Sequence, residues 1–149
     1  MDFPDLLDSL ELGIQFHVVE VDFELPEEEA LTAWIKSSIL AEDKQLKRLN
    51  FIFCSDAYLH GLNMDYLNHD TLTDIITFPY SNSQEVIEGD IFISIERIKE
   101  NALSFQVPFM QELKRVIIHG VLHLCGYKDK SKIEKEEMRA KENFYLGKA

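Results

Sequence analysis

The chain has 149 residues, of which 46% are hydrophobic and 11% aromatic, and this composition is typical of one globular domain rather than of a disordered chain. Its formal net charge of −12 argues against a general nucleic-acid binder, because phosphate contacts need lysine and arginine. Its apolar runs are too short to span a bilayer and its acidic N-terminus lacks the basic segment of a secretory signal, so we expect a cytoplasmic protein with no membrane partner.

Hydrophobic periodicity and capping residues divide the chain into strands and helices. In chain order we predict a strand over 14–25, a helix from Pro26 to about Asp43, a strand over 49–54, a helix capped by Ser55 and Asp56, strands over 74–80 and 90–95, and helices over 94–105, 109–125 and from Ser131 onward. Ser131 and Glu134 match the capping box of a helix N-terminus. Mixed strands and helices without strict βαβ alternation predict a single α+β domain over 1–149, with a mixed four-stranded sheet packed with helices.

Several familiar functional patterns are absent from the sequence. Cys54 and Cys125 are far apart in apolar surroundings, which indicates two buried thiols in a reducing compartment rather than a disulfide. No Cys-x-x-Cys pair is present for a zinc finger or a zinc deaminase, and no glycine-rich loop is present for a phosphate. The residue after His119 is Gly120, where an H-E-x-x-H metalloprotease needs glutamate as its general base, so a protease is a poor interpretation.

The helix predicted over 109–125 carries one narrow polar stripe. At 100° per residue His119 and His123 lie about 40° apart, Glu112 and Arg115 fall on the same stripe, and apolar side chains cover the rest. Imidazoles at i and i+4 are about 5–6 Å apart at their Cβ atoms, so both can bind one metal ion. Such a pair is also often only a hydrogen-bonded pair, and the spacing alone does not separate these interpretations.

Three further residues favour the metal. Gly120 removes a side chain where another element or a substrate can approach, and Gly126 fits the residue after a helix end. Asp129 follows on the next loop, and a third ligand from a turn leaves an open coordination position for water. We therefore predict a catalytic metal site formed by His119, His123 and Asp129, with one zinc ion per chain.

Charge is distributed unevenly around this motif. Residues 1–106 carry 6 basic and 21 acidic side chains, whereas residues 107–149 carry 9 basic and 6 acidic ones. The basic excess keeps an anionic substrate compatible with the acidic chain. A charged C-terminal helix is more often a solvated surface, so this signal is weak by itself.

The segment HGVLHLCGY, residues 119–127, resembles the H-G-x-L-H-L-x-G-Y-D-H signature of the YbeY family of bacterial endoribonucleases. Residues 62–66, 70–79 and 89–91 match the family blocks L-N-x-x-Y, D-x-x-T-D-V-L-S-F-P and G-D-I in the same order. The resemblance implies an α+β fold, zinc held by three side chains and cleavage of single-stranded ribosomal RNA. It further implies processing of the 3′ end of 16S ribosomal RNA, ribosome quality control, and the small ribosomal subunit or assembly factors as partners.

The sequence departs from the family pattern at two places. Asp129 occupies the position of the third histidine of the family. Its carboxylate oxygen is a harder donor than an imidazole nitrogen, so Mn²⁺ or another divalent ion can compete with zinc at this site. An arginine that the family has after the L-N-x-x-Y tyrosine is Leu67 here. If that arginine binds a phosphate, its nearest substitutes in the sequence are Arg115, Lys128 and Lys130.

These observations predict a metal-dependent endoribonuclease in which water on the metal attacks the phosphodiester. No side chain stands out as the general base, and Glu112 and His69 are the next candidates for the third ligand. The alternative is a non-catalytic ribosome-assembly factor in which the metal is structural. Chelator-sensitive cleavage of single-stranded RNA separates the two functions.

Overall fold

The computed structural model describes residues 13–68 and 73–149, so His69 and Asp70 lie outside the described residues. Its elements are β1 (Gly13–Val19), α2 (Glu28–Ala41), β2 (Gln45–Cys54), α3 (Asp56–Leu67), β3 (Ile75–Pro79), β4 (Val86–Ser94), α4 (Ile95–Phe105), α5 (Phe109–Leu124) and α6 (Lys132–Leu146). The strands form a sheet in the order β1-β2-β4-β3, in which β1, β2 and β4 are parallel and β3 is antiparallel to β4. The predicted α+β fold with a mixed four-stranded sheet is thus confirmed. Across both described ranges, no helix is long and apolar enough to cross a membrane.

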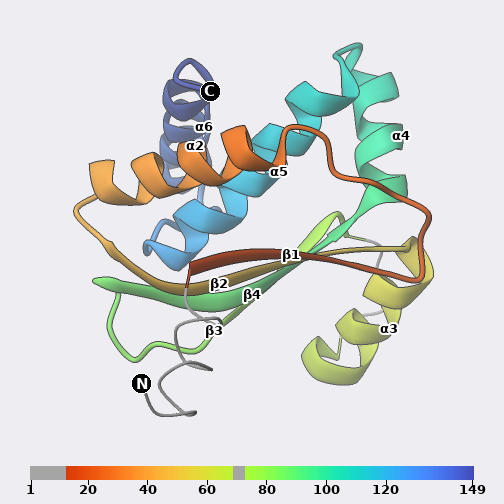
Figure 1. Cartoon of the computed structure of the whole chain (residues 1–149), viewed down its shortest axis with the longest axis horizontal. Helices are drawn as coiled ribbons and strands as arrows, with labels where there is room; N and C mark the ends of the chain where they lie inside the picture. Colours follow the sequence, from red (N-terminus) through yellow and green to blue (C-terminus); the bar gives the residue numbers. More distant parts are fainter. Residues whose placement is uncertain (1–12, 69–72) are drawn as a thin grey trace.

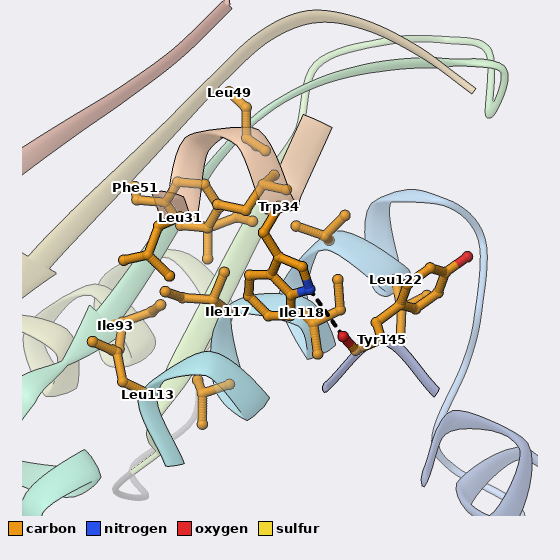
Figure 2. Close-up of a cluster of buried hydrophobic side chains, with 14 of the residues drawn as sticks. Leu31, Trp34, Leu49, Phe51, Ile93, Leu113, Ile117, Ile118, Leu122 and Tyr145 are labelled. Atoms are coloured by element: carbon orange, nitrogen blue, oxygen red, sulfur yellow. Dashed lines mark hydrogen bonds between the residues drawn. The ribbon is translucent and has the colours of Figure 1, made fainter. Parts of the chain in front are cut away.

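The described helices cover both faces of the sheet, with α2, α4, α5 and α6 on one face and α3 on the other (Figure 1). The larger core lies between the sheet and the first group of helices. Figure 2 shows Trp34 of α2 packed beside Ile117 and Ile118 of α5. The Trp34 indole nitrogen donates a hydrogen bond of 2.9 Å to the Tyr145 carbonyl, which joins α2 to the end of α6. Helix α5 is therefore fixed on the sheet with packing partners on either side.

A smaller apolar cluster lies under α3 and contains Cys54, Leu59 and Ile76. The second cysteine, Cys125, belongs to the larger core, and both thiols are free and buried as predicted. Burial raises the pKa of the Cys54 thiol to about 12 and that of Cys125 to about 11. Both thiols are thus kept in their unreactive, protonated form.

All four strands differ in length from their predicted ranges, and β3 is shorter than predicted by one residue at each end. The first ends at Val19, because Glu20 adopts a left-handed conformation with φ of 55°. Strands β2 and β4 begin earlier than predicted, at Gln45 and Val86. Polar side chains on their first halves, such as Lys47 and Glu88, are partnered across the strands at 3.8 Å rather than buried. The first half of β4 also contributes Ile87 to the larger core.

Gly89 of β4 is paired with Pro79 of β3. A Cβ atom there would lie 2.7 Å from the Phe78 carbonyl oxygen, which is part of the backbone of β3. We expect Gly89→Ala to lower the free energy of unfolding by about 1–3 kcal/mol, because the neighbouring backbone cannot move without disturbing the ladder. Gly61→Ala is the matched control, since nothing lies within 4 Å of its Cβ and alanine stabilises a helix by about 1 kcal/mol relative to glycine. Urea denaturation of both variants tests this, and a Gly89→Ala protein as stable as wild type would contradict it.

Candidate metal centre

The three predicted ligands come together at the C-terminal end of α5. The Nε2 atoms of His119 and His123 are 3.0 Å apart, and the Asp129 Oδ2 atom lies 3.3 Å from each of them. The ligand atoms of these residues all lie within 4.8 Å of one another. The cluster could therefore hold a metal ion. Among the described residues, no other group of three or more histidine, cysteine, aspartate or glutamate side chains brings its ligand atoms this close together.

The turn at Gly126 brings Asp129 back to the helix that carries the histidines. Gly126 has a φ of 110°, which favours glycine, and its amide donates to the His123 carbonyl at 3.0 Å. The Tyr127 amide donates to the Leu122 carbonyl at 3.1 Å, and the two bonds together form a Schellman motif. The predicted role of Gly126 as the residue after the helix end is confirmed.

Hydrogen bonds to the far side of each ring orient the imidazoles. The Nδ1 atom of His119 lies 2.7 Å from Glu142 Oε2, and that of His123 lies 3.0 Å from the Tyr127 carbonyl oxygen. Because a carboxylate and a carbonyl accept hydrogen bonds, we assign the N–H of each neutral ring to Nδ1. Both Nε2 lone pairs then point to the same place as the Asp129 carboxylate, which is the arrangement that a shared cation stabilises.

The electrostatic surroundings also favour a cation. Burial lowers the pKa of His119, but the hydrogen bond and charge of Glu142 outweigh this effect, and the charges of Asp129 and Asp74 add to them, so the net shift is upward. Burial likewise opposes ionisation of Glu142, yet its bonds to His119 and Arg115 lower its pKa. Negative charge is thus concentrated around His119. A divalent ion would be stabilised by the same carboxylates.

Two cavities meet at the cluster. The first has a volume of about 390 Å³ and is lined by the three ligands, by Leu67 of α3 and by residues 73–77 of β3 and the segment before it. The second has a volume of about 340 Å³ and reaches α4 and α6. His119 and Asp129 line both cavities, and so does Asp74, whose pKa is raised by burial. A bound metal would therefore be accessible to a ligand from two sides.

A sequence profile described as endoribonuclease YbeY matches residues 16–149, which include the whole cluster. The chain belongs to the endoribonuclease YbeY family. It is 53% identical over 134 residues to the endoribonuclease YbeY of Amoebophilus asiaticus, covering 90% of this chain and 91% of that relative. It is 58% identical over 124 residues to that of Flavobacterium psychrophilum, covering 83% and 88%. The solution structure of TM1509 from Thermotoga maritima is similar, with a TM-score of 0.62, 28% identity and coverage of 89% and 87%.

The structure places the other predicted site residues around the cluster. Glu112 is buried and lines the second cavity, but it does not belong to the group of three ligands. Gly120 faces the sheet, where an added Cβ would lie 2.8 Å from Ile75 Cδ1, so a strand rather than a substrate approaches it. Lys128 and Lys130 are exposed and line neither of the two cavities.

Glu142 is the site residue that sequence reasoning missed. It is 5% exposed, and besides His119 it accepts a bond of 2.9 Å from Arg115 NH1. The sequence does indicate that Glu142 is buried, because it lies on the buried stripe of α6 together with Met138 and Tyr145. A carboxylate on an otherwise apolar stripe needs a partner. The sequence shows this need but does not show that the partner is His119.

A second set of contacts holds the loop after α5. The Tyr127 hydroxyl donates to Glu42 Oε1 at 2.7 Å, and the Tyr145 hydroxyl donates to the other oxygen of the same carboxylate. The Lys141 amine also donates to Glu42, at 3.2 Å. Because the Tyr127 carbonyl accepts from His123, this anchor at the end of α2 restrains the orientation of a ligand.

We expect Glu142→Gln to weaken metal binding by about tenfold or more, because a partner that orients a metal-binding histidine contributes about 10–100-fold to affinity. The substituted amide keeps the volume of the side chain but loses the charge that faces His119. Glu137→Gln is the control, since Glu137 is exposed on the same helix. Competition with a chelating dye measures both affinities. Equal affinities in the two variants would show that the Glu142 charge has no effect on the site.

Proposed function

We propose that this chain is a metal-dependent endoribonuclease that hydrolyses phosphodiester bonds in single-stranded ribosomal RNA. The observation that carries the proposal is the cluster of His119, His123 and Asp129 between two cavities, in a chain of the endoribonuclease YbeY family. Each of these residues offers one ligand atom, and three protein ligands with an open position are typical of catalytic rather than structural zinc.

The residues of the chain prepare the site for such an ion. A divalent metal, when bound, polarises a phosphoryl oxygen and makes water a stronger nucleophile. Glu142 and the Tyr127 carbonyl hold the Nδ1 protons of the two histidines, which keeps both Nε2 atoms available. Asp129 supplies negative charge and reaches the cluster from the loop that follows α5. No rearrangement of these side chains is needed to bring the donor atoms together.

We propose zinc as the ion, in a ratio of one per chain. Two imidazoles and one carboxylate form the ligand set of several zinc hydrolases. The carboxylate is a harder donor than a third imidazole, so Mn²⁺ competes more effectively here than at a site of three histidines.

The substrate that we propose is RNA of the small ribosomal subunit, at the 3′ end of 16S ribosomal RNA, with the cytoplasm as the compartment and ribosome quality control as a linked role. The family resemblance of residues 119–127 supports this substrate, and the free thiols fit a reducing compartment. Lys128 and Lys130 are exposed beside Asp129, so we assign them contacts with phosphates outside the two cavities.

The alternative function is a ribosome-assembly factor with a structural metal. Structural zinc sites are closed by four protein ligands, whereas this cluster has three and opens on cavities. The geometry therefore favours an enzyme.

Cleavage of a fluorescent single-stranded RNA by the purified chain tests the proposal. We expect cleavage that a chelator stops and that added Zn²⁺ or Mn²⁺ restores, with a duplex of the same sequence cut more slowly. A protein that binds one metal ion but leaves the RNA intact under all these conditions would contradict the enzyme and favour the assembly factor.

A further inference from the structure

We propose that the second cavity binds one nucleotide of the RNA strand next to the scissile bond, with Phe105 stacked on its unpaired base and Arg139 bound to its phosphate. This proposal rests on the proposed function. It assigns substrate-binding roles to two residues that the metal cluster does not include.

The second cavity adjoins the metal cluster, as the first cavity does. It shares Asp74, His119 and Asp129 with the first cavity, so the cluster lies on the boundary between the two. An RNA strand whose phosphodiester reaches the metal must extend to both sides of it. One of those sides is the cavity that Phe105 and Arg139 line.

Phe105 is the last residue of α4, and it is 63% exposed although it is a large apolar side chain. A single exposed apolar residue is common on protein surfaces and needs no explanation by itself. Leu103 on the same helix is a case of this kind, since it is 79% exposed and lines neither cavity at the cluster. Phe105 differs because it lines the same cavity as His119 and Asp129.

Arg139 is the cation of this cavity whose charge is least neutralised. Among the described residues, Arg115 and Arg139 are the arginines and lysines that line the two cavities at the cluster. Arg115 donates through NH1 to Glu142 and through NH2 to Asn143, both at 2.9 Å, and its side chain is 16% exposed.

Arg139 has a looser arrangement. Its side chain is 65% exposed, and its NH1 atom is 3.6 Å from Glu142 Oε1, an oxygen that Arg115 already contacts at 2.9 Å. The other Glu142 oxygen accepts from His119. One buried carboxylate, Glu142, thus faces two guanidinium groups and an imidazole, and the charge of the buried Glu112 also acts on both arginines. Because its side chain is largely exposed, the Arg139 guanidinium remains accessible to an anion.

An exposed aromatic ring beside an available cation is the combination with which proteins bind single-stranded nucleic acids. The cation contacts the backbone and the ring stacks on a base, and stacking tolerates any base because each has a π-face. Only an unpaired base exposes that face. The cavity therefore predicts selection of single strands with little selection of sequence at this nucleotide.

The test uses the metal-loaded full chain and compares Phe105→Ala and Arg139→Gln with two exposed control variants, Leu103→Ala and Lys135→Gln. We expect each test variant to lower kcat/KM on single-stranded RNA about tenfold, chiefly through KM, since stacking of one base and one phosphate contact each contribute at about this level. Arg139→Gln should also make the slope of log K against log salt concentration shallower by ~0.7, because one phosphate contact on a single strand contributes about that much to the slope. The controls should stay within about twofold of wild type.

Abasic substrates separate the two roles. An RNA with an abasic nucleotide placed at successive positions should lose about tenfold in kcat/KM at one position with wild type, because the Phe105 ring then has no base to stack on. Phe105→Ala should show no such loss, because it has no ring on which that base could stack. Both variants should keep the metal affinity of wild type.

Test variants that match their controls would overturn the inference, and so would an abasic effect that persists in Phe105→Ala. Loss of metal in Arg139→Gln would also overturn it, because it would show that Arg139 acts through Glu142. The proposed function fails separately, if wild type itself shows no chelator-sensitive cleavage.

Discussion

His123→Ala should lose most of the bound metal, from about one ion per chain to less than about one tenth, and should cleave RNA at the rate of the chelated protein. The substitution removes one of three ligand atoms that lie within 4.8 Å of one another. Two remaining ligands hold a divalent ion much more weakly, because affinity depends on ligand number and geometry. Elemental analysis after dialysis measures the loss, and the cleavage assay measures its consequence.

His17→Ala is the control for this experiment, since His17 is exposed on β1 with its ring 3.3 Å from Asn50 and is not in the cluster. It should retain the metal. A ligand that binds the folded state raises the melting temperature, so added Zn²⁺ should stabilise wild type and His17→Ala but not His123→Ala. Wild-type protein that contains no metal, and whose melting temperature does not respond to Zn²⁺ or Mn²⁺, would contradict the metal site.

Asp129→Ala should weaken metal binding by more than about a hundredfold, whereas Asp129→His should retain it. Partners that only orient a ligand contribute about 10–100-fold, and a direct ligand contributes more. A carboxylate reaches a metal at about 2.0–2.2 Å and an imidazole at about 2.0–2.1 Å, so histidine can replace aspartate on this loop. Because the imidazole is the softer donor, Asp129→His should also bind Zn²⁺ more selectively over Mn²⁺ than wild type does. Competition titrations with both ions measure these affinities.

Undiminished metal affinity in Asp129→Ala would mean that another residue supplies the third ligand. Glu112 and His69 are then the next residues to replace. Glu112 is buried at the second cavity, and His69 lies outside the described residues. Asp129→Asn keeps the shape of the side chain without its charge, and therefore separates loss of the ligand from disturbance of the loop.

Local patterns in the sequence account for most of the fold and for the three proposed ligands. Periodicity and capping residues locate the helices, because a residue such as Ser131 acts on groups a few positions away. The two histidines are found for the same reason, since a spacing of four fixes their relation on any helix. Asp129 could be found because the turn at Gly126 keeps it within a few residues of His123.

Contacts between distant segments explain what the sequence could not predict. Glu142 lies 23 residues from His119, and Glu42 lies 85 residues from Tyr127, so no spacing rule connects either pair. The same limit applies to Phe105 and Arg139, which line one cavity only because α4 and α6 both pack against α5. The extra length of β2 and β4 includes polar residues paired across the strands, such as Lys47 and Glu88, as well as the buried Ile87.

The last helix supplies the carboxylate that orients His119, and this fixes when the nuclease can become active during its own synthesis. Both histidines and Asp129 are translated before α6, which supplies Glu142. A nascent chain still attached to the ribosome at residue 130 has its three ligands without that partner. The complete site therefore forms only after α6 has been synthesised and has packed against α5.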